Sequence, residues 1–140
     1  MPLVRISVLE TMAPDRRRVL PQVVYDAMRT AISIPENDLF VILTKHAEGE
    51  LVFDPTYLGM HRDSDFMAVH ITLRKGRSTE AKQALYREIA KLAQERASIN
   101  PNNILIVLSE NDMADWSFGR GEAQYVLNPP APPKPAGDAS

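Results

Sequence analysis

Hydrophobic and polar positions follow the same order in two parts of the chain, residues 2–46 and 67–110. Each part opens with a run rich in β-branched residues, continues with apolar residues at helical spacing and closes with a second β-branched run. Residues 12–34 can be laid over residues 77–99 without a gap, and the strand-like runs ENDLFVIL and PNNILIVL follow at the same offset. The pattern predicts two tandem strand–helix–strand units.

A crossover helix joins the two strands of such a unit, so the strands are expected to be parallel and the crossover right-handed. We therefore predict an α/β (α+β) fold in which both units share one mostly parallel four-stranded sheet, with two helices on one face. The connection over residues 47–65 is long enough to add a short hairpin around residues 51–53. Residues 2–127 are expected to form a single domain. Residues 128–140, rich in proline and small residues, are expected to form an extended flexible tail.

Particular residues mark where the helices begin and bend. Ser78 is a good N-cap for the second helix, and the acidic residue Glu80 follows in its first turn. Pro21 falls inside the apolar pattern of the first helix, where the missing amide donor predicts a bend.

Length and composition limit the class of protein. A chain of 140 residues with 44% hydrophobic content can bury a core without a metal or a disulfide. The net charge of −2 comes without a basic stripe, which argues against nucleic acid or a membrane surface as a partner. Cysteine is absent from the sequence, which excludes thiolate chemistry. Neither a signal peptide nor an apolar span is recognisable, so the cytoplasm is the expected location.

Pro2 is the first candidate for chemistry, because methionine before a small residue is normally removed during synthesis. The secondary amine left behind would titrate at roughly 8 when unperturbed, close to working pH. It could serve as a base, an acid or a nucleophile. The alternative is that Pro2 simply suits the first position of a strand.

Four features together identify a family. They are Pro2 before a strand, the two tandem units, GRSTEAKQALY at residues 76–86 and ADWSFGRGEAQY at residues 114–125. In these the chain resembles the tautomerase superfamily, and within it the malonate semialdehyde decarboxylase-like members. The resemblance runs from Pro2 to about Tyr125. It implies a fused pair of 4-oxalocrotonate tautomerase units, a homotrimer with each proline near a subunit boundary, a small carboxylate substrate, and no cofactor or metal.

The resemblance also assigns cationic residues. The decarboxylases carry two arginines one residue apart in the second strand-to-helix turn; Arg77 matches the second of these, and Lys75 stands at the first. An arginine just before the N-cap suits a bidentate carboxylate clamp, because the planar guanidinium and the helix N-terminus both favour an anion there. Lys75 and Arg74 could add positive charge to substrate binding, although for Arg74 a solvated turn is favoured. The alternative for all three is a solvated turn.

Asp38 matches the acidic residue that lies beside the proline in the decarboxylase. Its counterpart in the second unit is Asn103, and an acid in one half alone suits a single active site. A structural capping role remains open for Asp38.

Three further residues are candidates for substrate binding. Trp116 and Phe118 stand in a polar, glycine-bearing loop and could line a pocket, or could pack in the core or the trimer. Arg62 precedes the second unit and could reach the same pocket, although a charged loop that mixes Arg62 with acidic neighbours is typical of a solvated surface.

The leading functional hypothesis is a cofactor-independent keto–enol tautomerase in which Pro2 acts as a neutral amine and Arg77 holds the carboxylate of a 2-keto acid. The first alternative is a malonate semialdehyde decarboxylase or hydratase that uses cationic Pro2 with Asp38. The second alternative is a non-catalytic trimeric binding module.

Overall fold

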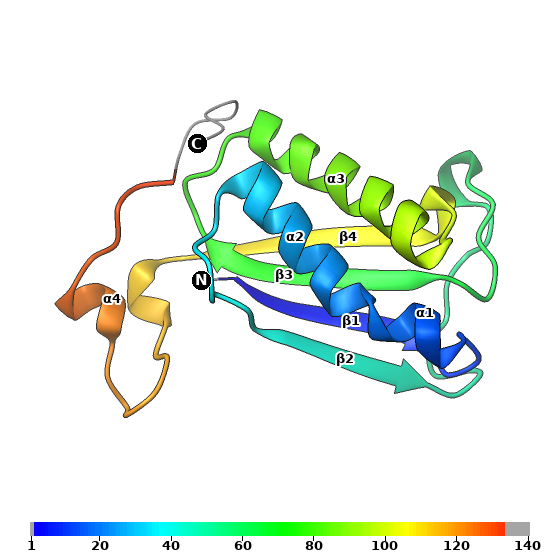
Figure 1. Ribbon diagram of the computed structural model, residues 1–140, viewed down its shortest axis with the longest axis horizontal. Coiled ribbons are helices and arrows are strands. Elements are labelled where there is room, and N and C mark those ends of the chain that lie inside the picture. Colours follow the sequence, from blue (N-terminus) through cyan, green and yellow to red (C-terminus); the bar gives the residue numbers. More distant parts are fainter. Residues whose placement is uncertain (1, 134–140) are drawn as a thin grey trace.

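The fold is built on a four-stranded sheet, described here in a computed structural model that covers residues 2–133. The strands are β1 (Leu3–Leu9), β2 (Val41–His46), β3 (Met67–Arg74) and β4 (Ile104–Asn111), in the order β2-β1-β3-β4 (Figure 1). Each unit contributes one parallel pair, β1 with β2 and β3 with β4, and the two units meet through the antiparallel pair β1 and β3. The predicted mostly parallel sheet is confirmed, with one antiparallel junction at its centre.

The helices that cross between parallel strands all cover one face of the sheet (Figure 1). In the first unit they are α1 (Pro14–Arg18) and α2 (Leu20–Ile32), and in the second α3 (Thr79–Ala97). The bend predicted from Pro21 is confirmed as a division of the helix at Val19, since the proline stands in the first turn of α2. Ser78 caps α3, its hydroxyl accepting a hydrogen bond from the Ala81 amide at 3.1 Å. Within residues 2–133 none of the helices has the length and apolar character needed to cross a membrane.

The core lies between the sheet and the helices. Every second residue of a central strand points to the helical face, and these side chains are buried. The inward residues of the two central strands are Val4, Ile6, Val8, Met67, Val69, Ile71 and Leu73. Burial of such a side chain stabilises the folded state by about 1.5 to 3 kcal/mol, so these residues hold the sheet against α2 and α3.

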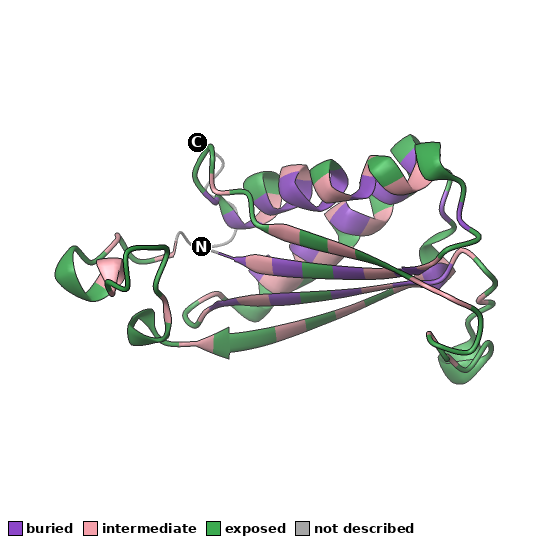
Figure 2. Ribbon diagram, turned by 90° about the horizontal axis from the view of Figure 1, so that it is seen from below, coloured by how far each residue is buried: buried purple, intermediate pink, exposed green. Residues whose placement is uncertain are grey.

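The opposite face of the sheet is not covered by a helix (Figure 2). Apolar side chains on this face remain exposed: Ile42 at 40%, Leu105 at 47% and Val107 at 48%. The two edge strands, β2 and β4, therefore present apolar side chains on this side of the monomer.

The connection between β2 and β3 does not contain the predicted hairpin, since no strand forms within residues 47–66. The Asp54 carboxylate instead accepts hydrogen bonds from the Thr56 and Tyr57 amides, both at 2.8 Å, and starts the short 3₁₀ helix η1 (Tyr57–Gly59). The Arg62 guanidinium donates to the Asp54 and Tyr57 carbonyls, both at 3.1 Å. These contacts satisfy backbone groups that a hairpin ladder would have used, which explains the difference.

The chain after β4 returns to the end of the sheet at which β1 begins (Figure 1). It forms the 3₁₀ helix η3 (Met113–Asp115) and then α4 (Gln124–Leu127). A further 3₁₀ helix, η2 (Pro101–Asn103), precedes β4. Of the proline-rich tail, residues 128–133 are described; they lie against the strand-to-helix turn, where Arg74 donates to the Ala131 carbonyl. Residues 134–140 lie outside the described part of the chain.

Candidate active site

Pro2 is buried at the entry to β1, while Met1 lies outside the described residues. In the sheet, Val4 pairs with Val41 and Leu3 with Thr72. Extending these registers past the last paired residues brings Pro2 to the level of Leu39, which precedes β2, and of Leu73 on β3. The start of β1, the start of β2 and the end of β3 therefore meet around this proline.

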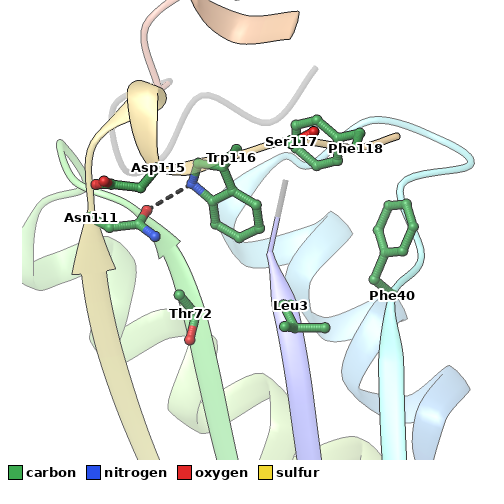
Figure 3. A pocket seen from close by; sticks show the side chains of 8 residues that line it. All are labelled: Leu3, Phe40, Thr72, Asn111, Asp115, Trp116, Ser117 and Phe118. Carbon is green, nitrogen blue, oxygen red and sulfur yellow. Dashed lines mark hydrogen bonds between the residues drawn. The ribbon is translucent and has the colours of Figure 1, made fainter. Parts of the chain in front are cut away.

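A cavity of about 380 Å³ opens at this end of the sheet (Figure 3). Its walls come from the ends of all four strands and from the loop after β4. They are formed by Leu3, Phe40, Thr72, Asn111, Asp115, Trp116, Ser117 and Phe118. The cavity thus adjoins Pro2 through its neighbour Leu3.

Two aromatic residues of the loop after β4 cover one side of the cavity, as Figure 3 shows. The rings of Trp116 and Phe118 stack, with centroids 5.5 Å apart and planes inclined by 7°, and Phe118 approaches Phe40 at 6.2 Å. The indole Nε1 of Trp116 donates to Asn111 Oδ1 at 2.7 Å, so the polar edge of the ring is satisfied. The two aromatic candidates therefore lie together in this cavity.

Local hydrogen bonds hold this loop in shape. Asp112 and Asp115 form a reciprocal capping box around η3. The Gln124 amide bridges the loop, accepting from the Phe118 amide at 2.9 Å and donating to the Gly119 carbonyl at 2.8 Å. The positive φ of Gly119, 144°, lets the chain reverse at this point. These hydrogen bonds thereby hold the loop that carries the two aromatic side chains.

Arg77 lies half-buried just before the N-cap of α3. Its Nη1 donates to the Arg74 carbonyl at 3.2 Å, and its Nε is buried without a hydrogen-bond partner among residues 2–133. Loss of hydration, followed by the charge of Arg74, lowers the pKa of Arg77 to about 10, with Glu110 and Tyr125 acting in the opposite direction. A guanidinium in this state gains from any anion that reaches it.

Arg74 and Tyr125 join Arg77, although the sequence analysis favoured a solvated turn for Arg74 and did not single out Tyr125. Arg74 is half-buried, and its Nε is also buried without a hydrogen-bond partner in the described part of the chain. Burial raises the pKa of the Tyr125 hydroxyl, while the charges of Arg74 and Arg77 oppose this shift. The alternation of β3 could have pointed to Arg74, because residues two apart share a face and Thr72 lines the cavity.

Lys75 borders a cavity of about 410 Å³ together with Arg74, but its charged group is paired elsewhere. Its ammonium forms an ion pair with Asp112 at 2.7 Å, and the side chain is 71% exposed. Asp112 is also the main reason that the pKa of Lys75 is raised. The β3 strand ends at Arg74, so the next side chain turns outward, and spacing along the sequence alone misses this change of direction.

Asp38 is half-buried in the connection between α2 and β2. The Tyr25 hydroxyl holds this connection, accepting from the Asn37 amide at 2.9 Å and lying 3.4 Å from the Pro35 carbonyl to which it donates. Asp38 lies three residues before Val41, which begins β2 and pairs with Val4 of β1. The counterpart of Asp38, Asn103, is instead 1% exposed and bonded to Asp63 at the other end of the sheet. Of these two equivalent positions in the repeat, only the one at the end that carries Pro2 is therefore an acid.

Arg62 lies away from this cavity within one chain. It precedes β3, whereas the cavity is at the end of that strand. It borders a separate, mainly apolar cavity of about 310 Å³ with residues of the β2–β3 connection, among them Leu51, Phe53 and Phe66. The expectation that Arg62 reaches the same pocket as Pro2 is not met within a monomer.

The arrangement offers a buried proline, two half-buried guanidinium groups, a carboxylate and an aromatic wall at one end of the sheet. Guanidinium groups bind a carboxylate, and an aromatic wall keeps water from the reacting carbon atoms. Within residues 2–133, no three histidine, aspartate or glutamate side chains come together as metal ligands do. The site is thus suited to moving protons on a small organic acid.

Other proteins are similar to this chain in sequence. Residues 38–119 match the family model described as tautomerase enzyme. The probable tautomerases YusQ and YrdN of Bacillus subtilis strain 168 are each 32% identical to the chain over 126 residues, which cover 90% of it and 99% and 97% of the two relatives.

Solved structures give a consistent result. A malonate semialdehyde decarboxylase superposes with a TM-score of 0.86 at 29% identity, covering 92% of this chain and 99% of that one. A second malonate semialdehyde decarboxylase, inhibited by 3-bromopropiolate, superposes with a TM-score of 0.86 at 31% identity and covers 92% and 98%. A fused 4-OT described as a symmetric trimer, 18% identical with a TM-score of 0.74, shares the fold over 90% of this chain and 98% of its own.

Proposed function

The chain belongs to the tautomerase family of enzymes, and we propose that it interconverts the enol and keto forms of a small 2-keto acid with the amine of Pro2. The observation that carries the proposal is the burial of Pro2 at the end of the sheet that also holds Arg77, a half-buried cation whose Nε finds no hydrogen-bond partner within residues 2–133. A proton-transferring amine and a carboxylate-binding group are the two parts that such a reaction requires.

In the proposed reaction, neutral Pro2 first accepts the hydroxyl proton of the enol. The O–H bond breaks and an N–H bond forms, and the electron pair becomes part of the growing carbonyl. The same proton then passes from nitrogen to the adjacent carbon, so the N–H bond breaks, a C–H bond forms and the amine is regenerated. Arg77 holds the carboxylate through both steps, and Trp116 and Phe118 shield the reacting carbon from water.

Opposite influences act on the pKa of the Pro2 amine. The cationic side chains of Arg74 and Arg77 lower it and favour the neutral base, whereas an ionised Asp38 beside Leu39 raises it and favours the cation. Two guanidinium groups stand against one carboxylate, so we expect the neutral form to be available near pH 7. This expectation favours tautomerisation, which needs a base.

Decarboxylation is the second candidate, because malonate semialdehyde decarboxylases superpose on the chain at 29% and 31% identity. In this reaction cationic Pro2 would polarise the aldehyde carbonyl of malonate semialdehyde. The C–C bond to the carboxylate breaks, carbon dioxide leaves, and the electron pair is held as an enolate that is then protonated on carbon. The presence of Arg74 beside Arg77 removes one objection, since a second arginine is available although Lys75 faces outward.

A homotrimer belongs to the same proposal. A fused 4-OT of the same fold is a symmetric trimer, and the uncovered sheet face of this chain carries exposed Ile42, Leu105 and Val107. The family assignment weighs against a trimer that only binds ligands.

Two measurements test the proposal. Intact-protein mass spectrometry is expected to give a mass that lacks Met1, because a peptide bond at Pro2 would leave no amine to titrate. With phenylenolpyruvate as substrate, kcat/KM is expected to fall as the pH drops through the pKa of the Pro2 amine, and Pro2→Ala to lose roughly a hundredfold or more.

Malonate semialdehyde distinguishes the two candidates. A decarboxylase with cationic Pro2 should lose activity as the pH rises through the same pKa. Activity on malonate semialdehyde alone, with only this alkaline loss, would replace the tautomerase by the second candidate. Active protein that retains Met1 would remove both mechanisms.

A further inference from the structure

A second cavity lies at the end of the sheet opposite Pro2. It has a volume of about 310 Å³ and is bordered by Ala68, near the start of β3, and by Leu105, near the start of β4. Residues of the loop after β2 complete it, as residues of the loop after β4 complete the Pro2 cavity. Because β1 and β3 are antiparallel, the two units place corresponding cavities at opposite ends of one sheet.

The repeat relates the walls of the two cavities residue by residue. Residues 12–34 match residues 77–99, so each position in one unit corresponds to the position 65 residues away in the other. At this offset segment 51–53 matches segment 116–118, and Ala68 and Leu105 match Leu3 and Phe40. All of these residues line one cavity or the other. The second cavity is therefore the counterpart of the candidate active site.

The groups that we assign to proton transfer do not recur at this end of the sheet. Pro2 corresponds to Met67, which lies within β3 and is fully buried, so the chain has no terminal amine there. Arg77 corresponds to Met12, a core residue that is 2% exposed. The second cavity thus has the walls of the first without its amine or this cation, and it is suited to binding a ligand without converting it.

Aromatic side chains line the second cavity. The rings of Phe53 and Phe66 stack with centroids 4.3 Å apart and planes inclined by 24°. Phe66 is buried and Phe53 is half-buried, whereas Val52, which also borders the cavity, is 83% exposed, so the cavity is open to solvent. Apolar cavities of roughly 150 Å³ take up a benzene ring. A cavity of about 310 Å³ has room for a ring with a substituent.

Two charged side chains border the cavity and balance each other. The Arg62 guanidinium donates to the carbonyls of Asp54 and Tyr57, both at 3.1 Å. The Thr56 and Tyr57 amides, and to a smaller extent Arg62, lower the pKa of the Asp54 carboxyl, so it is ionised at pH 7 and offsets the charge of Arg62. The pair supplies one donor and one acceptor, and a hydroxyl group can bond to both because it donates and accepts.

We propose that this cavity binds a small uncharged aromatic molecule that carries a hydroxyl group, with the ring against Phe53 and Phe66 and the hydroxyl toward Arg62 and Asp54. An anion would lose its hydration in an apolar cavity beside an ionised carboxylate, so it is disfavoured. The proposal stands apart from the reaction at Pro2, because none of the residues assigned to that reaction lines this cavity.

Benzyl alcohol is the probe, and isothermal titration calorimetry on the full chain measures its affinity. Ala68→Met places a long side chain in the cavity and is expected to weaken binding by at least about 10-fold, because the ring loses its space. Thr44→Met adds the same side chain at an exposed strand position that borders neither cavity, and it should change the affinity less than about twofold. Should Ala68→Met fail to fold, Ala68→Val fills less of the cavity and should still weaken binding at least about threefold.

Benzoate, with the same ring and a carboxylate, tests the class of ligand. At the site that Ala68→Met blocks, benzoate should bind at least about 10-fold more weakly than benzyl alcohol. Equal affinities of the two compounds at that site would overturn the assignment to an uncharged ligand.

Trp116 separates the two cavities, because it is the only tryptophan of the chain and lines the Pro2 cavity. Its fluorescence should not respond to benzyl alcohol. A response of Trp116 together with an unchanged affinity in Ala68→Met would place the probe beside Pro2 and overturn the proposal. Absence of binding to the wild-type chain would overturn it as well. If Val107→Lys, which charges the uncovered sheet face, then bound the probe, the cavity would belong to a contact with a second copy of the chain.

Discussion

Arg77 carries its charge where hydration is largely lost, and this lowers the stability of the folded chain. Burial lowers its pKa from the ordinary guanidinium value to about 10, so the unfolded state binds the proton more tightly. Between these two values the unfolded state holds more protons, and the free energy of unfolding therefore rises with pH. At pH 7 the full penalty is present. An anionic ligand bound to Arg77 would offset this cost of burying its charge.

Replacing Arg77 by a neutral residue of similar volume should therefore stabilise the protein. We expect Arg77→Met to raise the free energy of unfolding at pH 7 by about 1 to 3 kcal/mol, taking one pKa unit as 1.36 kcal/mol and discounting for partial exposure. Urea denaturation measures this difference. Arg18→Met, at a side chain that is 75% exposed, is the control and should change stability by less than about 0.5 kcal/mol. A loss of stability in Arg77→Met would show that its contacts outweigh the cost of burial.

The enzyme should lose activity when the Arg77 side chain is shortened. Arg77→Ala is expected to lower kcat/KM for a carboxylate substrate by an amount that corresponds to a loss of about 2 to 4 kcal/mol of transition-state stabilisation, because a charged contact in a closed pocket is removed. Lys75→Ala should have a much smaller effect, since the exposed lysine is paired with Asp112. Steady-state kinetics with phenylenolpyruvate measures both variants. Small, equal effects would show that Arg77 is a solvated surface residue without a role in substrate binding.

At the scale of elements, the turn from β3 to α3 positions the cations. β3 ends at Arg74, Gly76 reverses the chain, and Ser78 caps the helix that follows Arg77. Pro133 of the tail lies against Gly76, where an added Cβ would come within 3.3 Å of its ring. Ala131 and Pro133 of the tail therefore contact this turn.

The helix cap should matter for both stability and binding. Ser78→Ala removes the acceptor for the Ala81 amide and is expected to cost about 1 kcal/mol of stability. Because Arg77 directly precedes the cap, KM for a carboxylate substrate should rise as well. Thermal unfolding and kinetics on Ser78→Ala beside Thr79→Ala, an exposed neighbour without a capping bond, measure both effects. A raised KM in Thr79→Ala of the same size would contradict the role of the cap.

At the scale of the whole molecule, one face of the sheet is covered by α2 and α3 and the other is not (Figure 2). The uncovered face carries exposed Ile42, Leu105 and Val107, which lie on strands on both sides of the central pair. Burying an apolar surface of this kind against other subunits releases free energy of about 25 cal/mol per Å². The monomer is thus suited to association through its open face.

Charge on this face should prevent the association. We expect the wild-type chain to sediment as a trimer, and Val107→Lys to shift it toward the monomer, because a lysine would have to be buried in an apolar contact. Gln94→Lys, which adds the same charge on the solvent side of α3, is the control and should leave the trimer intact. A wild-type chain that sediments as a monomer at micromolar concentration would contradict the prediction.

The sequence by itself determined what depends on local order. The period of apolar residues predicted both strand–helix–strand units, Ser78 predicted the cap of α3, and Pro21 predicted the interruption before α2, because these features involve neighbours along the chain. The loop ADWSFGRGEAQY likewise pointed to the family, and its Trp116 and Phe118 do lie in the cavity. The prediction of a hairpin around residues 51–53 was wrong. The Asp54 side chain instead accepts hydrogen bonds from the Thr56 and Tyr57 amides, so the chain turns there.

Only the tertiary structure decided which charged side chains meet. Arg74, Lys75 and Arg77 are adjacent in the sequence, yet Arg74 and Arg77 converge while Lys75 turns outward to Asp112. A side chain at the end of a strand takes the direction set by the last ladder pair, here Arg74 with Asn111, and by the turn that follows at Gly76. Tyr125 reaches the same place because the chain after β4 folds back, and Arg62 stays at the other end of the sheet because β3 separates it from the cavity. Residue spacing contains neither the end of a ladder nor the return of a loop, so these contacts arise only in the folded chain.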